Sequence, residues 1–208
     1  DFLPKKSKCL FMPNPTDSSF EVLNNYSNNH CSMDVFFALS HGVHRGVLKK
    51  GKHDERADFV NKLVELTPNV KFDLYGINNV QPIWADSFLK SISNAKMGVN
   101  LSRGDPIKYY SSDRITQLIG NGLLTFIHQN TFYGNFFKNN EVIFYKNLSD
   151  LSEKIQKYAR DDELRKKIAK NGKDKYTKFF NSTVVASYII DKTFDNKDKY
   201  KYFWEKYI

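Results

Sequence analysis

Short, continuous apolar runs along the chain alternate with segments whose apolar residues recur at helical spacing. Continuous apolar runs are typical of parallel strands covered on both faces, because neither face of such a strand meets water. They predict strands over residues 33–39, 70–75, 97–101, 123–127 and 142–145. Helical spacing predicts helices near residues 54–66, 88–92, 112–120, 148–158, 161–179 and 184–189. This alternation predicts an α/β fold, a Rossmann-like doubly wound parallel sheet with a helical C-terminal end.

The two ends of the chain depart from this alternation. Pro13 and Pro15 disfavour both helices and central strands, so residues 1–30 are predicted to form a connector and residues 31–190 the domain. Residues 191–208 are aromatic and basic, and we expect a tail helix there. That tail either packs on its own domain or crosses to a partner domain.

The composition suits one domain of ordinary size. The chain has 208 residues, of which 40% are hydrophobic, enough to fill a core. No apolar run approaches the ~18 residues that a membrane helix needs, and the charged start lacks the apolar stretch of a signal peptide. Cys9 and Cys31 fit neither a redox nor a zinc spacing. Free thiols and a cytoplasmic location are therefore expected, with a disulfide left open.

The formal net charge of +9 points to anionic partners. Nucleic acid, anionic lipid and phosphorylated small molecules all qualify, and ordinary solvated surface charge is the alternative. In doubly wound sheets, ligands bind beyond the carboxyl ends of the strands. The loops that follow the predicted strands are therefore the candidate sites.

The loop over residues 40–46 follows the first predicted strand. Gly42 lets backbone amides approach a ligand closely, and Arg45 can pair with a phosphate. His41 and His44 add further donors. The loop matches neither a dinucleotide-binding nor a P-loop motif, so an ordinary glycine turn with an exposed arginine is the alternative.

The loop over residues 76–84 follows the second predicted strand and is polar. It begins at Gly76 and ends at Trp84. The indole could stack on a base or a sugar, so both residues are candidates for the ribose and base. Alternatively, Trp84 belongs to the core or to a hinge.

The loop over residues 100–114 is the densest functional candidate. It joins a strand end to a helix start, where free amides and the helix dipole favour an anion. The alternative is a long surface connector. Gln117 lies one turn beyond Asp113 and can share its helix face, or it is a surface residue. The candidate donor and phosphate contacts are Arg103, Lys108, Ser111, Ser112, Asp113 and Arg114.

No familiar catalytic or metal motif is present in the sequence. The nucleophile elbow, the zinc-protease pair and metal-spaced clusters of His and Asp are all missing. None of the five histidines is therefore a strong metal candidate.

In this order, the segments resemble the C-terminal domain of two-Rossmann-domain (GT-B) glycosyltransferases. The resemblance is to the glycosyltransferase family 1-like group related to the spore-maturation protein CgeB. Its most specific stretch, residues 109–122, is similar to the donor-binding helix of the family, R-x-x-E-x-x-x-x-G. The resemblance covers residues 11–190 and also rests on residues 11–15, 34–45, 141–145, 148–155, Asn171-Gly172 and Tyr176.

The resemblance implies that this domain binds a nucleotide diphosphate sugar. Arg45 and Arg114 would hold the diphosphate, and Gln117 occupies the position of the ribose-contacting glutamate. Tyr109 stands where related retaining enzymes carry a further acidic residue. Fixed cations and helix amides would stabilise the charge that develops on the departing β-phosphate. The resemblance therefore implies no metal ion, and no cofactor apart from the substrate nucleotide diphosphate sugar.

The resemblance also implies a partner. The acceptor, a glycan or glycoconjugate, would bind to a missing N-terminal domain, which would also supply any general base. Because the chain starts with Asp1 and a connector-like segment, we expect an excised or naturally partial transferase of polysaccharide or glycoconjugate synthesis.

Two other hypotheses stay open. The chain could be a non-catalytic module that binds a nucleotide or nucleotide sugar, which the missing acceptor half and Gln117 favour. It could also bind nucleic acid, as the charge of +9 and the basic aromatic tail suggest. Against the second stands the absence of any nucleic-acid-binding motif, so no nucleic-acid partner is expected.

Overall fold

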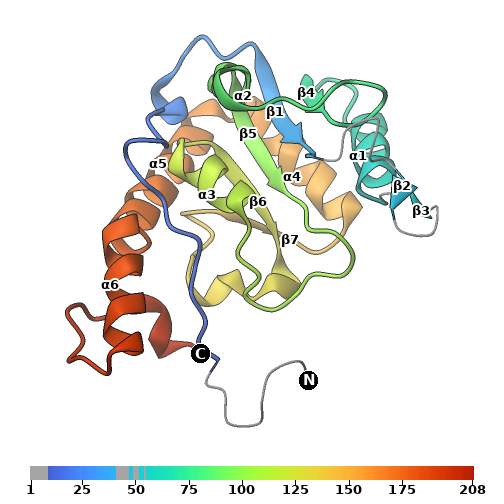
Figure 1. The fold of residues 1–208 in the computed structure, drawn as a ribbon. Coiled ribbons are helices and arrows are strands. Elements are labelled where there is room, and N and C mark those ends of the chain that lie inside the picture. Colours follow the sequence, from blue (N-terminus) through green and yellow to red (C-terminus); the bar gives the residue numbers. More distant parts are fainter. Residues whose placement is uncertain (1–8, 41–46, 49–51, 54) are drawn as a thin grey trace.

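A computed structural model describes residues 9–40, 47–48, 52–53 and 55–208. In this part of the chain, five strands form one parallel sheet in the order β4-β1-β5-β6-β7 (Figure 1). Val35 pairs with Phe72 on one side and with Met97 on the other. The strands are β1 (Met33–Ala38), β4 (Phe72–Tyr75), β5 (Ala95–Asn100), β6 (Leu124–His128) and β7 (Ile143–Tyr145), and β2 (Val47–Leu48) pairs separately with β3 (Lys52–His53).

The helices lie close to the predicted positions, and polar side chains begin several of them. Asn147, Asp161 and Asn181 each accept a hydrogen bond from a backbone amide three residues later, which satisfies a donor that the helix itself cannot. The helices are α1 (Glu55–Leu66), α2 (Ala85–Ser93), α3 (Asp113–Gly120), α4 (Leu148–Arg160), α5 (Asp162–Phe179) and α6 (Ser182–Thr193).

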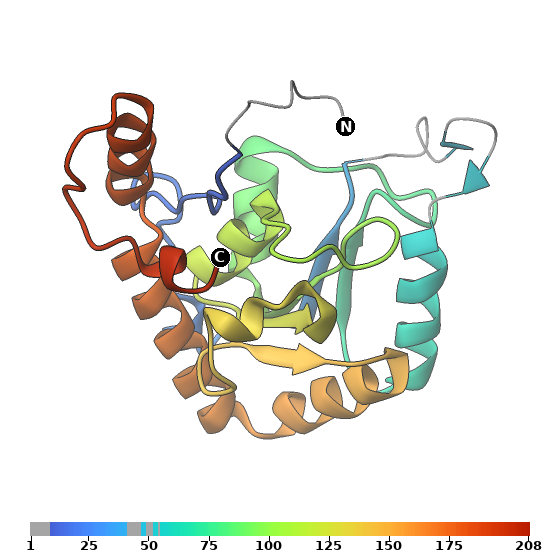
Figure 2. The ribbon, with the colours of Figure 1, turned by 90° about the horizontal axis from the view of Figure 1, so that it is seen from below.

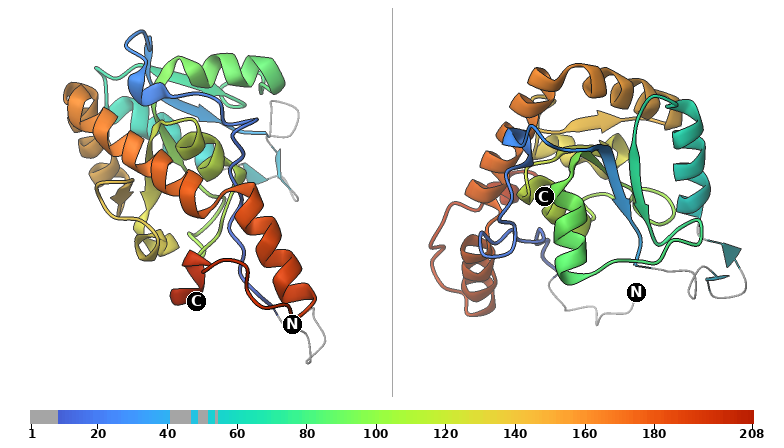
Figure 3. Two further views of the ribbon diagram at one scale, coloured as in Figure 1. Left: turned by 90° about the vertical axis from the view of Figure 1, so that its left-hand side faces the viewer. Right: turned by 90° about the horizontal axis from the view of Figure 1, so that it is seen from above.

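Helices cover both faces of the sheet (Figures 2 and 3). Side chains alternate between the faces along a strand, so Val35 and Phe37 join the core beneath α1 and α4, whereas Phe36 joins the core beneath α2 and α3. On the second face, a Cβ at Gly98 would lie 2.3 Å from Leu118 Cδ2. A glycine in β5 therefore lets α3 approach the sheet closely. The predicted doubly wound architecture is confirmed.

The strand order fixes where a ligand can enter. From β1 the chain crosses to the sheet edge at β4 and then returns to the other side of β1 at β5. The connections to β4 and to β5 thus leave β1 in opposite directions. Loops diverge at such a switch point, which opens a crevice at the carboxyl ends of the two strands.

The segment predicted as a connector packs on the domain through Thr16 and Asn25. Thr16 forms a bridge with Asn181, and its amide donates to the carbonyl of Phe180 over 2.9 Å. Asn25 is buried and donates to the carbonyls of Ile92 and Ala95 over 2.6 and 2.8 Å. The segment predicted as a connector therefore covers α3 and α5 along one side of the molecule (Figure 1).

The tail differs from the predicted helix over residues 191–208. Helix α6 ends at Thr193, and only a short 3-10 helix, η5 (Phe203–Lys206), follows. The chain turns back because the carboxylate of Asp191 accepts bonds from the amide of Lys199 and the hydroxyl of Tyr202. Trp204 is then fully buried in an aromatic cluster, so this tail packs on its own domain.

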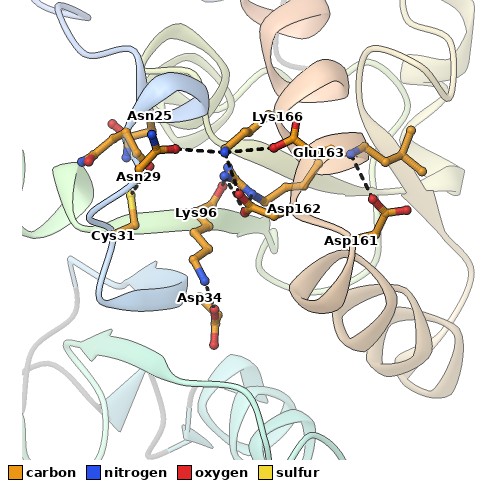
Figure 4. A network of polar contacts seen from close by, with 12 residues as sticks. Asn25, Asn29, Cys31, Asp34, Lys96, Asp161, Asp162, Glu163 and Lys166 are labelled. Carbon is orange, nitrogen blue, oxygen red and sulfur yellow. Dashed lines mark hydrogen bonds and ion pairs between the residues drawn. The ribbon is translucent and has the colours of Figure 1, made fainter.

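A network of charges lies at the amino ends of β1 and β5 (Figure 4). Asp34, near the start of β1, pairs with Lys96, near the start of β5, over 2.8 Å. Arg165 of α5 is fully buried and pairs with Asp162 over 2.8 Å. Cys31 lies nearby, and burial raises the pKa of its thiol. This network ties α5 to the sheet at the edge opposite the crevice.

Candidate functional site

A cavity of about 1040 Å³ opens at the switch point between β1 and β5. Residues after each strand line it: Ser40 follows β1, and Ser102 and Arg103 follow β5. The first turns of α1, α2 and α3 contribute Arg56, Trp84–Asp86 and Ser112–Arg114, with Gln117 one turn further along α3. Residues 19–22 of the connector, which precede the first strand, complete the lining. The cavity therefore lies where the strand order places a ligand.

Arg114 is held at the carboxyl edge of the sheet. Its guanidinium donates to the carbonyl of Leu101 over 3.0 Å and to that of Ala38 over 3.1 Å. It also lies over the ring of Phe37, at 5.2 Å from the ring centre. One side chain thus bridges the ends of β1 and β5, and its charge is fixed beside the cavity.

The first turn of α3 faces the cavity without a side-chain cap. Ser112 occupies the N-cap position, but its hydroxyl donates to Asn100 Oδ1 over 2.9 Å and makes no cap bond. The side-chain amide nitrogen of Asn100, Nδ2, is buried and has no hydrogen-bond partner among the described residues. The hydroxyl of Ser112 is therefore engaged by Asn100 rather than by the helix, and the positive end of α3 is directed at the cavity.

Three arginines line the cavity among the side chains that the structure describes: Arg56, Arg103 and Arg114. Arg56 was missed at the sequence level because helical periodicity places it on the outer face of α1. The available signal was its place in the first turn after the loop that follows β1, where anions bind.

Gln117 and Trp84 also line the cavity. Asp113 and Gln117 share one face of α3, as their spacing predicts. Trp84 precedes α2 and is 63% exposed, so its indole is not part of the core. Phe20 and Tyr110 give the same cavity further exposed rings.

Three predicted site residues lie outside the lining. The amine of Lys108 sits over the rings of Tyr109 and Phe132, and the hydroxyl of Ser111 accepts a bond from the amide of Asn14 over 2.8 Å. Gly76 has φ +76°, and a Cβ there would lie 2.1 Å from the carbonyl oxygen of Leu39. Its glycine is required by the chain path after β4 rather than by a ligand.

The candidates in the loop after β1 are not placed. Gly42, Arg45, His41 and His44 lie outside the residues that the structure describes. The predicted role of Arg45 in binding the diphosphate therefore stays a prediction.

Three further properties of the described residues concern metal binding, membrane spans and disulfides. Within these ranges, no group of three or more His, Cys, Asp or Glu side chains is arranged to hold a metal ion. No helix of the described chain is long and apolar enough to cross a membrane. Cys9 and Cys31 are unpaired.

Comparisons with known proteins agree with this architecture. The sequence profile of a family described as glycosyl transferase-like matches residues 55–191. No curated protein matches the chain.

Three solved structures resemble the fold at low sequence identity. Sucrose-phosphate synthase from Thermosynechococcus elongatus has a TM-score of 0.63 and 11% identity over 93% of this chain. TarM has a TM-score of 0.56 and 12% identity over 89% of it. HepE from Anabaena, in complex with UDP and glucose, has a TM-score of 0.56 and 12% identity over 82% of it.

The chain spans only 38%, 54% and 49% of TarM, the synthase and HepE, respectively. The likeness shows the fold, which is the Rossmann-like architecture of one half of a GT-B enzyme.

Proposed function

Since this chain belongs to the glycosyl transferase-like family, we propose that it binds a nucleotide diphosphate sugar as the donor half of a GT-B enzyme. A separate domain holds the acceptor, and the sugar is transferred between them. The proposal rests on one observation: three arginines and the first turn of α3 line a single cavity at the switch point. A volume of about 1040 Å³ is large enough for a nucleotide-sized ligand.

In this proposal, the arginines and α3 bind the diphosphate. Departure of a nucleoside diphosphate leaves negative charge on the β-phosphate, and fixed cations stabilise that charge as it develops. Arg114 suits this task because two carbonyls already orient it. Arg56 lies in the first turn of α1 and Arg103 in the loop after β5, and both line the cavity. We propose that these groups act without a metal ion.

Gln117 and Trp84 are assigned to the nucleoside in this proposal. Gln117 can accept a hydrogen bond from a ribose hydroxyl, without the charge assistance that a glutamate would give. The exposed indole of Trp84 can stack on the base. The HepE structure, in complex with UDP and glucose, supports testing uridine nucleotides first.

Calorimetric titration with UDP, GDP, ADP and their sugar conjugates tests the proposal. We expect one nucleotide to bind saturably, and Arg103→Ala to weaken it by about tenfold, as for loss of one charge-assisted hydrogen bond. Arg160→Ala is the matched control, because Arg160 is exposed at the end of α4 and does not line the cavity. A folded chain that binds none of these nucleotides would overturn the proposal.

A second candidate is a nucleotide-sugar-binding module without transferase activity. Tyr109 favours it, since this position carries an acidic residue in the retaining enzymes that the chain resembles. Its side chain is buried, and its hydroxyl bonds to the carbonyl of Tyr207 over 2.9 Å and to Asn135 over 2.6 Å. Detection of transfer or donor hydrolysis by this chain would exclude the second candidate.

The acceptor and the cellular setting belong to the same proposal. We propose a glycan or glycoconjugate acceptor, polysaccharide synthesis as the process and the cytoplasm as the location. Transfer assays with the chain joined to an acceptor domain would test the acceptor class.

A further inference from the structure

A stiff segment of the connector crosses the start of α3. Proline fixes its own φ and drives the preceding residue to an extended conformation. Pro13 and Pro15 flank Asn14, so this tripeptide, here called the strap, has little conformational freedom. Just beyond the strap, the amide of Thr16 donates to Phe180 and its carbonyl accepts from Ser182, both over 2.9 Å. The strap is thus anchored where α5 meets α6.

Asn14 bonds to α3 and α5 through its amide, its carbonyl and its side chain. Its backbone amide donates to the hydroxyl of Ser111, and its side-chain Nδ2 donates to Asp113 Oδ1, each over 2.8 Å. Its carbonyl accepts from the hydroxyl of Tyr176 over 2.8 Å and from that of Thr116 over 3.3 Å. A residue about one hundred positions before α3 therefore fixes the entry and the first turn of that helix.

The bond to Asp113 matters because of where this carboxylate lies. Asp113 lines the cavity beside Arg114, and a carboxylate turned toward a bound diphosphate would repel it. The amide of Asn14 gives this carboxylate a partner on the connector side of the helix. Orientation of Asp113 is thereby tied to the position of the strap.

We propose that Asn14 is a positioning residue that couples the connector to the donor cavity through Asp113 and the first turn of α3. This inference rests on the proposed function for the identity of the ligand. A displaced strap would release Asp113 toward the cavity and lower the affinity for the nucleotide. The connector is thereby part of the binding site, although Asn14 itself does not line the cavity.

The test exchanges the two partners of the bond. Asn14→Asp places two carboxylates face to face, and the pair Asn14→Asp with Asp113→Asn restores one amide and one carboxylate in swapped positions. Asp113→Asn alone completes the cycle. Ser18→Asp is the matched control, because it adds the same charge to an exposed connector residue outside the cavity lining. Since the bond is at the surface, these variants should fold.

Two measurements separate a positioning role from a structural one. We expect Asn14→Asp to weaken nucleotide binding by about tenfold, as for loss of one hydrogen bond to a charged group. Hydrogen exchange should accelerate in residues 111–117, with little change in β5 and β6. The double variant should recover both properties, and Ser18→Asp should change neither.

Either of two results would overturn the inference: uniform acceleration of exchange across the fold, or a double variant no better than Asn14→Asp alone. If the unaltered chain binds no nucleotide, the proposed function fails. The exchange measurements still decide whether Asn14 holds the first turn of α3.

Discussion

At the residue scale, single side chains at the carboxyl edge of the sheet set the shape of the site. Arg114 joins the ends of β1 and β5 through two carbonyls. Gly76 lets the ends of β4 and β1 approach closely, because a glycine has no Cβ that would collide with the carbonyl of Leu39. Ser40, the residue after Leu39, lines the cavity. The cavity wall therefore depends on a close backbone contact that only glycine permits.

Gly76→Ala should destabilise the protein. The left-handed backbone at φ +76° costs about 1–2 kcal/mol for a residue with a Cβ, and the contact at 2.1 Å with a backbone oxygen adds to this. Urea denaturation should show a lower free energy of unfolding by at least that amount. In Gly134→Ala, the added Cβ meets nothing within 4 Å, so this control should stay close to the unaltered protein. Equal stability of the two variants would contradict the argument.

The sequence predicts that several of the candidate residues lie together, and their role in binding stays a prediction. Arg103, Ser112, Asp113, Arg114, Gln117 and Trp84 all line one cavity, because each follows a parallel strand and such strand ends share one edge. Arg56 and the connector residues were missed, since helix periodicity does not show which outer face meets a ligand. Local patterns also do not show a contact such as that of Asn14 with Asp113.

At the scale of elements, the strands and helices follow the predicted alternation, whereas the tail does not. Apolar continuity identified the sheet because parallel strands are buried on both faces. The predicted tail helix is not formed beyond Thr193, and the aromatic residues of the tail pack into a cluster with Phe180 and Tyr188. Asp191 and Lys192 hold this path: Lys192 pairs with Asp198 over 2.8 Å and with Glu205 over 3.0 Å. These polar contacts of Asp191 and Lys192 with residues 198–205, here called the clasp, therefore set the path of the tail.

The clasp should be sensitive to acid. The amide of Lys199 and then the hydroxyl of Tyr202 lower the pKa of Asp191. Its stabilising contribution is therefore fully present above the unfolded pKa of about 4, and is lost as the pH falls through the lower folded pKa. Asp191→Asn should melt at a lower temperature than the unaltered protein at pH 7.

Thermal unfolding from pH 7 to pH 2.5 checks this prediction. The difference between Asp191→Asn and the unaltered protein should shrink below about pH 4, because the carboxyl of the unfolded chain takes up a proton there and the native carboxyl does so only at its lower folded pKa. Asp195→Asn removes an exposed carboxylate beyond the end of α6 and is the control. A difference that does not depend on pH would assign Asp191 a role in packing alone.

At the scale of the whole molecule, part of the net charge of +9 is already engaged in contacts among the described residues. Several lysines are paired with carboxylates away from the cavity, as Lys96 is with Asp34 at the opposite edge of the sheet. Others lie over aromatic rings, as Lys108 does over Tyr109. Specific recognition is expected at the cavity, where Arg103 and Arg114 converge.

Oligonucleotides should therefore bind weakly. We expect no saturable binding of single-stranded or duplex DNA or RNA at 150 mM salt, because lysines that already pair with carboxylates, such as Lys96 and Lys192, release few counterions from a nucleic acid. Fluorescence anisotropy with labelled oligonucleotides, compared with a labelled nucleotide, measures this directly. Tight, steeply salt-dependent oligonucleotide binding would favour the nucleic-acid hypothesis instead.

Two segments from opposite ends of the chain meet on one ring. The rings of Phe11 and Tyr207 each lie 5.8 Å from the ring of Phe136. Tyr109, in the loop before α3, contacts Phe11 through its ring and the carbonyl of Tyr207 through its hydroxyl. A fusion partner attached after Tyr207, or one leading into Phe11, would start its path beside this loop. Because the next residue of this loop, Tyr110, lines the cavity, a domain fused at either position would begin beside a segment of the cavity wall.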